Sequence, residues 1–230
     1  MSNRPKSPAY IAVIADIKGS RLLANRDDTQ NQLRETLRLV NERFADTIAS
    51  KFTITLGDEF QGLLHSTEHL FPILHEIEQR MHPVKVRFGL GIGAITTDIN
   101  PELAIGADGP AYYNARKSVE YLKHSEKKHQ TGAADIRIEA GEEALLPTPL
   151  LNTVFLLLTA VKQTWSKQQR LVIWDMLSNR DTQSNVAVRM NIRQPSVQKS
   201  LASGNYYAYR DALFTVEQTL HAWEMRWENV

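Results

Sequence analysis

Residues 10–140 alternate between apolar runs typical of strands and apolar positions at helical spacing. Strand patterns lie at Tyr10–Ala15, Phe52–Leu56, Phe60–Leu64 and in the segment after Pro83, VKVRFGLGIGAITT. Helical patterns cover about 27–49, 68–81 and the segment that begins at Pro110, and 134–139 alternates like a short edge strand. This β-α-β-β-α-β-α-β order predicts a ferredoxin-like or palm-type sheet with helices on one face.

Three glycines recur in the strand pattern that follows Pro83. Gly89, Gly91 and Gly93 alternate with apolar residues and therefore share one face of the strand. Glycine weakens a strand, so its repeated use there indicates close approach by another element or by a ligand. The sequence leaves these two alternatives open.

The patterns after the prolines at 147 and 149 are helical, which predicts a domain boundary there. Helices are expected over 150–165, 167–177 and 214–227, the last of them amphipathic and a candidate dimer helix. Between them, Thr182 is placed to cap a helix that ends near Met190, and a second helix begins at Gln194 or Pro195. This layout is typical of a helix-turn-helix, with the tyrosines at 206, 207 and 209 as a short wing or as packing residues.

Composition excludes several classes of function. The chain has no cysteine, so it has no disulfides, no thiolate zinc site and no cysteine nucleophile. The first ten residues lack the apolar core of a signal peptide, and there is no apolar run of about 18 residues to span a membrane. We therefore expect a cytoplasmic protein with no membrane partner. The net charge is +1, with a small basic excess after residue 150 that weakly favours an anionic partner.

Two aspartates carry the candidate chemistry. Asp16 ends the first buried strand and is followed by a small-residue loop, which is where open sheets place ligands. Asp58 lies in the Gly-Asp-Glu turn between two strand patterns, a hairpin signal. The predicted topology makes these two positions neighbours, and two carboxylates there suit one or two Mg²⁺ or Mn²⁺ ions that hold a triphosphate. The alternatives are an aspartate that merely ends a strand and a polar hairpin tip.

The sequence resembles the SatD family in four ordered motifs over roughly residues 8–140. They read YIAVIADIKGSR, KFTITLGDEFQGLL, VRFGLGIGAITT and AIGADGPAYYNARK. The core of that family is similar to class III nucleotidyl cyclases and GGDEF diguanylate cyclases. The resemblance implies an α+β fold: a ferredoxin-like, palm or nucleotidyl-cyclase-like domain over residues 1–146. An all-α helix-turn-helix domain is expected over residues 147–230.

The resemblance also implies roles for individual residues. Asp16 and Asp58 match the two metal-binding aspartates, and Ile17 matches the position that lends a backbone carbonyl to the metal. The phosphate-facing loop corresponds to Lys18, Gly19 and Ser20. Arg116 falls where cyclases carry an arginine that stabilises charge on the phosphate. Its alternative is a structural ion pair.

The departures from the cyclase pattern concern turnover. Leu56 replaces the first glycine of the GGDEF hairpin. Aligning Arg116 puts Tyr112 where class III cyclases have a transition-state asparagine, and Asn114 is out of register by two residues, which turns it away on a helix. Binding of metal and nucleotide is therefore favoured over cyclisation, and the sequence leaves enzymatic activity undecided.

The second helix of the helix-turn-helix pattern carries side chains suited to base edges and phosphates. These are Gln194, Ser196, Gln198 and Lys199, and Arg189 and Arg193 are candidate backbone contacts. The first hypothesis is a homodimeric regulator that binds a nucleotide with Mg²⁺ and binds DNA. The second is an active nucleotidyl cyclase or nucleotidyltransferase whose helical domain docks a protein. The third is an adaptor with a degenerate core.

Overall fold

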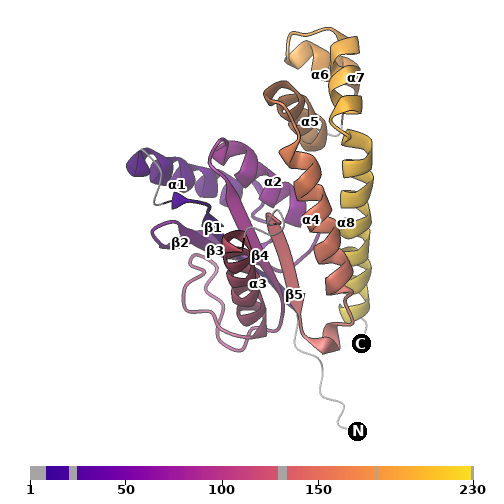
Figure 1. The fold of residues 1–230 in the computed structure, drawn as a ribbon. Coiled ribbons are helices and arrows are strands. Elements are labelled where there is room, and N and C mark those ends of the chain that lie inside the picture. The colour runs from indigo at the N-terminus through magenta and orange to yellow at the C-terminus, as the bar shows by residue number, and fades with distance from the viewer. Residues whose placement is uncertain (1–8, 21–24, 129–133, 180, 229–230) are drawn as a thin grey trace.

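The computed structural model describes residues 9–20, 25–128, 134–179 and 181–228 (Figure 1). The strands are β1 (Tyr10–Ile17), β2 (Ile48–Leu56), β3 (Glu59–Leu64), β4 (Val86–Gly93) and β5 (Ile136–Ala140). The helices of the first part are α1 (Arg26–Arg43), α2 (Leu70–Met81) and α3 (Pro110–Lys127). After the short 3₁₀ turn η2 (Glu142–Ala144) come α4 (Thr148–Gln163), α5 (Lys167–Asn179), α6 (Gln183–Arg189), α7 (Gln194–Ser203) and α8 (Tyr206–Glu228).

The five strands form one sheet in the order β2-β3-β1-β4-β5. Each neighbouring pair among β2, β3, β1 and β4 is antiparallel, and β5 runs parallel to β4. A βαββαβ unit whose first strand lies between the third and fourth is the ferredoxin-like arrangement, which confirms the predicted α+β class. β1 is central and buried on both faces, as its continuous apolar run predicts.

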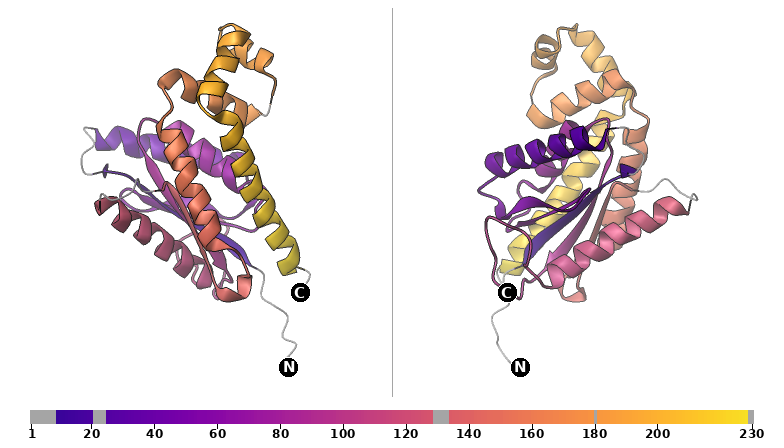
Figure 2. Two further views of the ribbon diagram at one scale, coloured as in Figure 1. Left: turned by 45° about the vertical axis from the view of Figure 1, so that its right-hand side comes forward. Right: turned by 90° about the vertical axis from the view of Figure 1, so that its left-hand side faces the viewer.

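The two faces of β1 meet different helices. Ile11, Val13 and Ala15 belong to a buried cluster with α1 and α2, whereas Ala12 and Ile14 pack against α3. Figure 2 shows α1 and α3 on opposite sides of the sheet. The expectation of helices on one face is therefore wrong for α3, and the strand alternation sends Asp16 to the α3 side.

The strand glycines let α3 lie directly on β4. A Cβ added to Gly91 would lie 2.1 Å from both the carbonyl oxygen of Ala111 and the amide nitrogen of Ala115. Additions at Gly89 and Gly93 would also meet the α3 backbone closer than 3.0 Å. Of the two alternatives, close approach by another element is the one observed.

Two helix boundaries differ from the prediction. Helix α1 ends at Arg43, because Phe44 is its C-cap and the chain turns there into β2, which begins at Ile48. Phe44 and Ile48 are both apolar and fit the helical period, so the sequence pattern predicts a helix that is too long. Helix α8 begins at Tyr206 instead of residue 214. The three tyrosines lie in its first turns and form no wing: Tyr206 and Tyr209 are buried, whereas Tyr207 is exposed.

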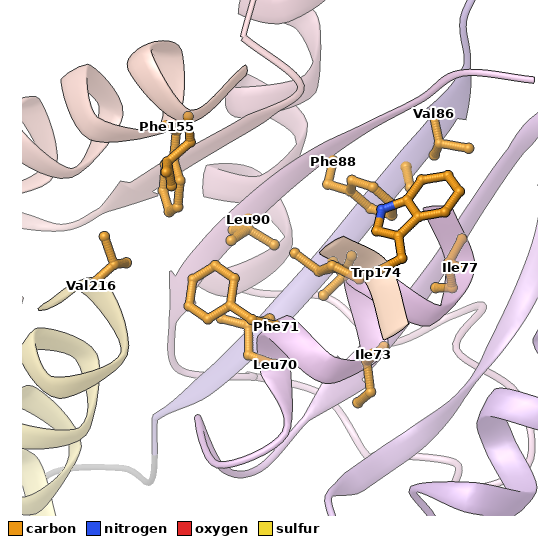
Figure 3. Packing of buried hydrophobic residues seen from close by; sticks show 14 of the residues in the cluster. Leu70, Phe71, Ile73, Ile77, Val86, Phe88, Leu90, Phe155, Trp174 and Val216 are labelled. Atoms are coloured by element: carbon orange, nitrogen blue, oxygen red, sulfur yellow. The ribbon is translucent and has the colours of Figure 1, made fainter. Parts of the chain in front are cut away.

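Helices α4 and α8 run side by side and continue the layer of α1 and α2 (Figure 1). Phe71 of α2, Phe155 of α4 and Val216 of α8 converge over Leu90 of β4 (Figure 3). At the far end of α8, Glu224 accepts hydrogen bonds from the amide and hydroxyl of Thr67 at 2.9 and 2.6 Å. α5, α6 and α7 form the end of the molecule away from the C-terminus.

The predicted boundary at Pro147 coincides with the start of α4 at Thr148. One buried apolar cluster nevertheless runs from Ile11 in β1 to Trp223 in α8. The division into two domains at residues 146–147 stays a prediction.

Candidate functional site

Three charged residues form a row across neighbouring strands at the end of β1. Asp16 is paired in register with Glu59 on β3 and with Arg87 on β4. Cross-strand neighbours point to the same face, and their Cβ atoms lie about 5 Å apart. All three are buried, so each charge needs a partner within the protein.

Helix α3 places two cationic side chains over this row, about two turns apart on one side of the helix. Arg116 donates two hydrogen bonds to Glu59, from Nη1 to Oε2 at 2.7 Å and from Nη2 to Oε1 at 2.8 Å. The Lys123 ammonium lies 3.4 Å from Glu59 Oε2 and 3.5 Å from Asp16 Oδ1. The two carboxylates are thus bridged by an ammonium group.

Arg87 completes the charge balance from the other side. Its Nε lies 3.3 Å from Asp16 Oδ2, and its Nη2 lies 3.0 Å from Glu126 on α3. The orientation at Nε is not that of a hydrogen bond, so this buried group lacks a hydrogen-bond partner. The Arg87–Asp16 contact is therefore a charge contact.

The two carboxylates respond differently to this environment. Burial raises the pKa of Asp16 above its ordinary value, because desolvation outweighs the attraction of Lys123 and Arg87. Burial would also raise the pKa of Glu59, but the hydrogen bonds and charge of Arg116, together with Lys123, hold it below its ordinary value. Of the two carboxylates, Asp16 is thus the one whose negative charge is less well stabilised by its neighbours.

Asp58 lies in the turn between β2 and β3, at the same end of the sheet as Asp16. Its backbone carbonyl accepts a hydrogen bond from the amide of Ile17 at 3.2 Å. The charge of Asp58 acts on Asp16 and adds to the rise of its pKa. The metal-binding roles of Asp16, Asp58 and Ile17 stay predictions.

The described side chains near Asp16 do not form the set of oxygen ligands that Mg²⁺ requires. Within the described ranges, no three His, Cys, Asp or Glu side chains are grouped so as to hold a metal ion. Asp16 and Glu59 already face cationic nitrogens, whereas magnesium needs carboxylate oxygens free to coordinate at about 2.0–2.1 Å. As arranged, the residues at Asp16 do not fit an open magnesium site.

The predicted phosphate loop is only partly open. Lys18 Nζ lies 2.7 Å from Glu126 and 2.8 Å from Asp135, so its charge is already paired with two carboxylates. Gly19 has a positive φ of 65° and would meet nothing within 4 Å if it gained a Cβ. Ser20 is half-buried. The phosphate-binding role of these three residues stays a prediction.

The residues that mark the departure from cyclases have structural partners. Tyr112 is buried against Ala12 and Ile14, and its hydroxyl lies 3.4 Å from the carbonyl oxygen of Ala104. The amide of Asn114 donates to the carbonyl oxygen of Ile92 at 2.8 Å. Neither side chain reaches the Asp16 row. Arg116 makes the ion pair that was its alternative explanation, and its catalytic role is untested.

Some of the residues predicted to contact DNA are already bonded within the protein, and the others are exposed. Arg189 is held by Asp175 and Asp181 through hydrogen bonds of its guanidinium group. Gln194 donates to Gln183 on α6 at 2.8 Å. The remaining four are exposed at the start of α7 or just before it: Arg193, Ser196, Gln198 and Lys199.

Sequence reasoning missed the counter-ions of the site. Arg87 and Lys123 contact Asp16, and Glu126 contacts Arg87, but no local pattern singles out these three residues together. One signal existed: Arg87 is the charged residue in a strand that is otherwise apolar and buried on both faces. Lys123 lies two turns beyond Arg116, but only the packing of α3 shows that both reach the same carboxylate.

A groove also lies away from the buried row. A groove of about 1230 Å³ runs between α2 and α8. Its walls combine arginines at 43, 80 and 210 with carboxylates at 68, 76, 211 and 217. This mixture of charges defines no ligand class, so the chemistry of the buried row is the better guide.

The sheet order and the run of helices after residue 147 define an α+β protein with a ferredoxin-like core and a helical C-terminal part. The SatD family model matches residues 10–214, and the chain therefore belongs to the SatD family. A search of curated proteins found no match.

Solved structures give weaker likenesses. The guanylate cyclase domain of RhGC from Catenaria anguillulae, in complex with GTP, is 15% identical, with 50% of this chain and 75% of that chain covered and a TM-score of 0.37. The dimeric guanylyl cyclase domain of RhoGC from Blastocladiella emersonii is 14% identical, with 50% and 74% covered and a TM-score of 0.38. A regulator of polyketide synthase expression from Bifidobacterium adolescentis is 11% identical, with 96% and 85% covered and a TM-score of 0.30. At these TM-scores the likenesses assign no residue and no activity.

None of the described helices combines the length and the apolar character that crossing a bilayer requires.

Proposed function

We propose that this SatD protein is a regulatory protein that binds DNA through α6 and α7 used as a helix-turn-helix. The observation that carries the proposal is the division of α7 into two sides. Val197 and Leu201 are fully buried, whereas Ser196, Gln198 and Lys199 are exposed. A recognition helix needs this combination of an apolar anchor and free polar side chains.

The connection between the helices supports the same proposal. Thr182 caps α6 by accepting a hydrogen bond from the amide of Asn185. Asn191 adopts a positive φ of 52° in the turn, and the amide of Ile192 donates to Ala187 at 3.0 Å. The turn is therefore fixed by backbone contacts, and α7 is held at a defined angle to α6.

Arg189 is expected to have a structural role instead of contacting DNA. Two aspartates already neutralise Arg189, so we assign it to holding α5 and α6 together. Arg193 and Lys199 are the proposed phosphate contacts. Ser196 and Gln198 are the proposed contacts to base edges, and Gln194 would join them by giving up its hydrogen bond to Gln183.

A nucleotide is the proposed ligand of the α+β half, on the resemblance of its motifs to cyclase cores. The open space at Gly19 supports access to that loop. Turnover is less favoured, because Tyr112 is part of the core and Asn114 is bonded to β4. We also propose a homodimer, the symmetry usual for DNA-binding regulators.

Fluorescence anisotropy with a labelled pool of random-sequence duplexes, at several salt concentrations, tests DNA binding. We expect salt-dependent binding, and Lys199→Ala should weaken it for all sequences and reduce the salt slope by about 1. Gln198→Ala should change which sequences are selected from the pool. Lys117→Ala is the matched control, since Lys117 is an exposed lysine on α3.

Repeating the titration with ATP or GTP tests the ligand. A nucleotide that shifts the DNA affinity without releasing pyrophosphate supports a sensor. Pyrophosphate release that disappears in Asp16→Asn would instead make the protein an enzyme. Absence of DNA binding at low salt would contradict the proposal and favour protein docking by the helical part.

A further inference from the structure

The two buried carboxylates of the site already have a cation between them. Lys123 Nζ lies 3.5 Å from Asp16 Oδ1 and 3.4 Å from Glu59 Oε2. Asp16 and Glu59 are cross-strand partners whose side chains share one face of the sheet. Two carboxylates in this position repel each other unless a cation lies between them. A divalent ion would meet that need, but Lys123 meets it already.

The remaining carboxylate oxygens are also paired. Asp16 Oδ2 faces Arg87 Nε at 3.3 Å, and both oxygens of Glu59 accept hydrogen bonds from Arg116. Every oxygen of the two carboxylates thus lies within reach of a cationic nitrogen. A metal ion that entered the row would need to displace these groups and would meet their positive charge.

We infer that Lys123 is the resident cation of the buried row and that it pairs with Asp16, one of the two carboxylates that the cyclase pattern assigns to a divalent metal. In this arrangement Asp16 contributes nothing to the binding of Mg²⁺ or Mn²⁺. The inference disagrees with the magnesium site that the sequence predicts at Asp16 and Asp58. It is independent of whether the protein binds DNA.

The position of Lys123 makes the inference testable. Its side chain is 35% exposed, whereas the carboxylates are almost fully buried, so it closes the row on the solvent side. Replacing it with methionine keeps the apolar stem and removes the charge. The gap left would be bordered by Asp16 Oδ1 and Glu59 Oε2, with Asp58 in the adjacent turn.

Mn²⁺ titration of the full chain, followed by the loss of the electron paramagnetic resonance signal of free Mn²⁺, measures metal binding directly. We expect wild-type protein to bind no Mn²⁺ at millimolar concentrations through Asp16. Lys123→Met should bind Mn²⁺ at least about tenfold more tightly than wild type, because the positive charge that repels the ion from the two carboxylates is gone. Adding Asp16→Asn to that variant should abolish the gain.

Lys117→Met is the matched control, because Lys117 is an exposed lysine on the same helix that pairs with Glu139. It should behave as wild type. The inference is overturned if wild-type protein binds Mn²⁺ and Asp16→Asn removes that binding, a measurement that needs no Lys123 variant to fold. It is also overturned if folded Lys123→Met binds no more Mn²⁺ than wild type.

Discussion

At the scale of single residues, Asp16 shows where sequence reasoning succeeds and where it stops. Strand alternation and the apolar run before it place Asp16 at the end of a central strand. The partners of its carboxylate come from β4 and α3, far away in sequence. No local pattern states that a lysine on α3 reaches an aspartate on β1. The position was therefore predictable and the electrostatics were not.

His75 is a second residue whose properties come from packing. Its ring lies edge-on to Trp174, with the ring centres 6.2 Å apart, and its Nε2 atom is buried without a hydrogen-bond partner. Burial lowers the pKa of His75 to about 4, with Glu78 opposing this effect and Lys162 adding to it. The imidazole is therefore neutral in the folded protein at neutral pH.

This burial predicts acid sensitivity. The unfolded chain protonates His75 below its ordinary pKa of 6.5, whereas the folded chain resists until about 4. The stabilising contribution is complete above 6.5 and is lost as the pH falls toward 4. Urea unfolding at about pH 7.5 and about pH 5 should show a stability loss of up to about 2 kcal/mol that His75→Gln lacks.

The control for this prediction is His124→Gln, because His124 is exposed on α3. It should leave the pH dependence as in wild type. An identical loss of stability in wild type and His75→Gln would assign the acid sensitivity to other groups.

At the scale of elements, the contact between α3 and β4 depends on glycine. The side-chain-free face of β4 allows the α3 backbone to lie against the strand, and this contact positions Arg116 and Lys123 over the carboxylates. The alternation of glycines was visible in the sequence. Which element lies on them was not, because a ligand would require the same space.

Gly91→Ala tests this contact. The new methyl group would lie 2.1 Å from the α3 backbone, so the helix must shift. We expect a loss of about 3 kcal/mol or more of unfolding free energy, as for overpacked cores. Urea unfolding monitored by circular dichroism measures it.

Gly19→Ala provides the comparison. Gly19 has a positive φ but open space around it, so alanine there costs only about 1–2 kcal/mol of backbone strain. Equal losses in the two variants would show that strand conformation, and not the approach of α3, requires glycine at 91.

Helix ends were harder to predict than helix existence. Phe44 and Ile48 continue the apolar period of α1, yet Phe44 caps the helix and Ile48 begins β2. Both are apolar because they face the same core, whichever element carries them. Periodicity identifies the buried face of a segment but does not identify the residue at which the backbone changes direction.

At the scale of the whole molecule, the α+β half and the helical half share one core. Beyond the apolar cluster, the buried Lys162 on α4 lies 2.6 Å from Glu78 on α2 and 2.7 Å from Asp135 beside β5. Removing one partner of such a buried group leaves an uncompensated charge. The two halves are therefore linked by both apolar and ionic contacts.

We expect this linkage to make unfolding cooperative across both halves. All four tryptophans lie after the predicted boundary, at 165, 174, 223 and 227. Tryptophan fluorescence thus reports on the helical half, whereas far-ultraviolet circular dichroism reports on both. Urea transitions followed by the two probes should coincide. Separate midpoints would instead support two independently folding domains with the boundary at 146–147.

The sequence by itself determined the strand and helix order, the ferredoxin-like topology and the position of Asp16 at a strand end. These follow from local periodicity and from a few rules about which strands pair. Only the tertiary structure decided that α3 covers the other face of the sheet, that Lys123 lies between the two carboxylates and that Arg189 is already neutralised. Those features depend on side chains that meet across long sequence separations, where the free energy of burying charge, and not local propensity, selects the arrangement.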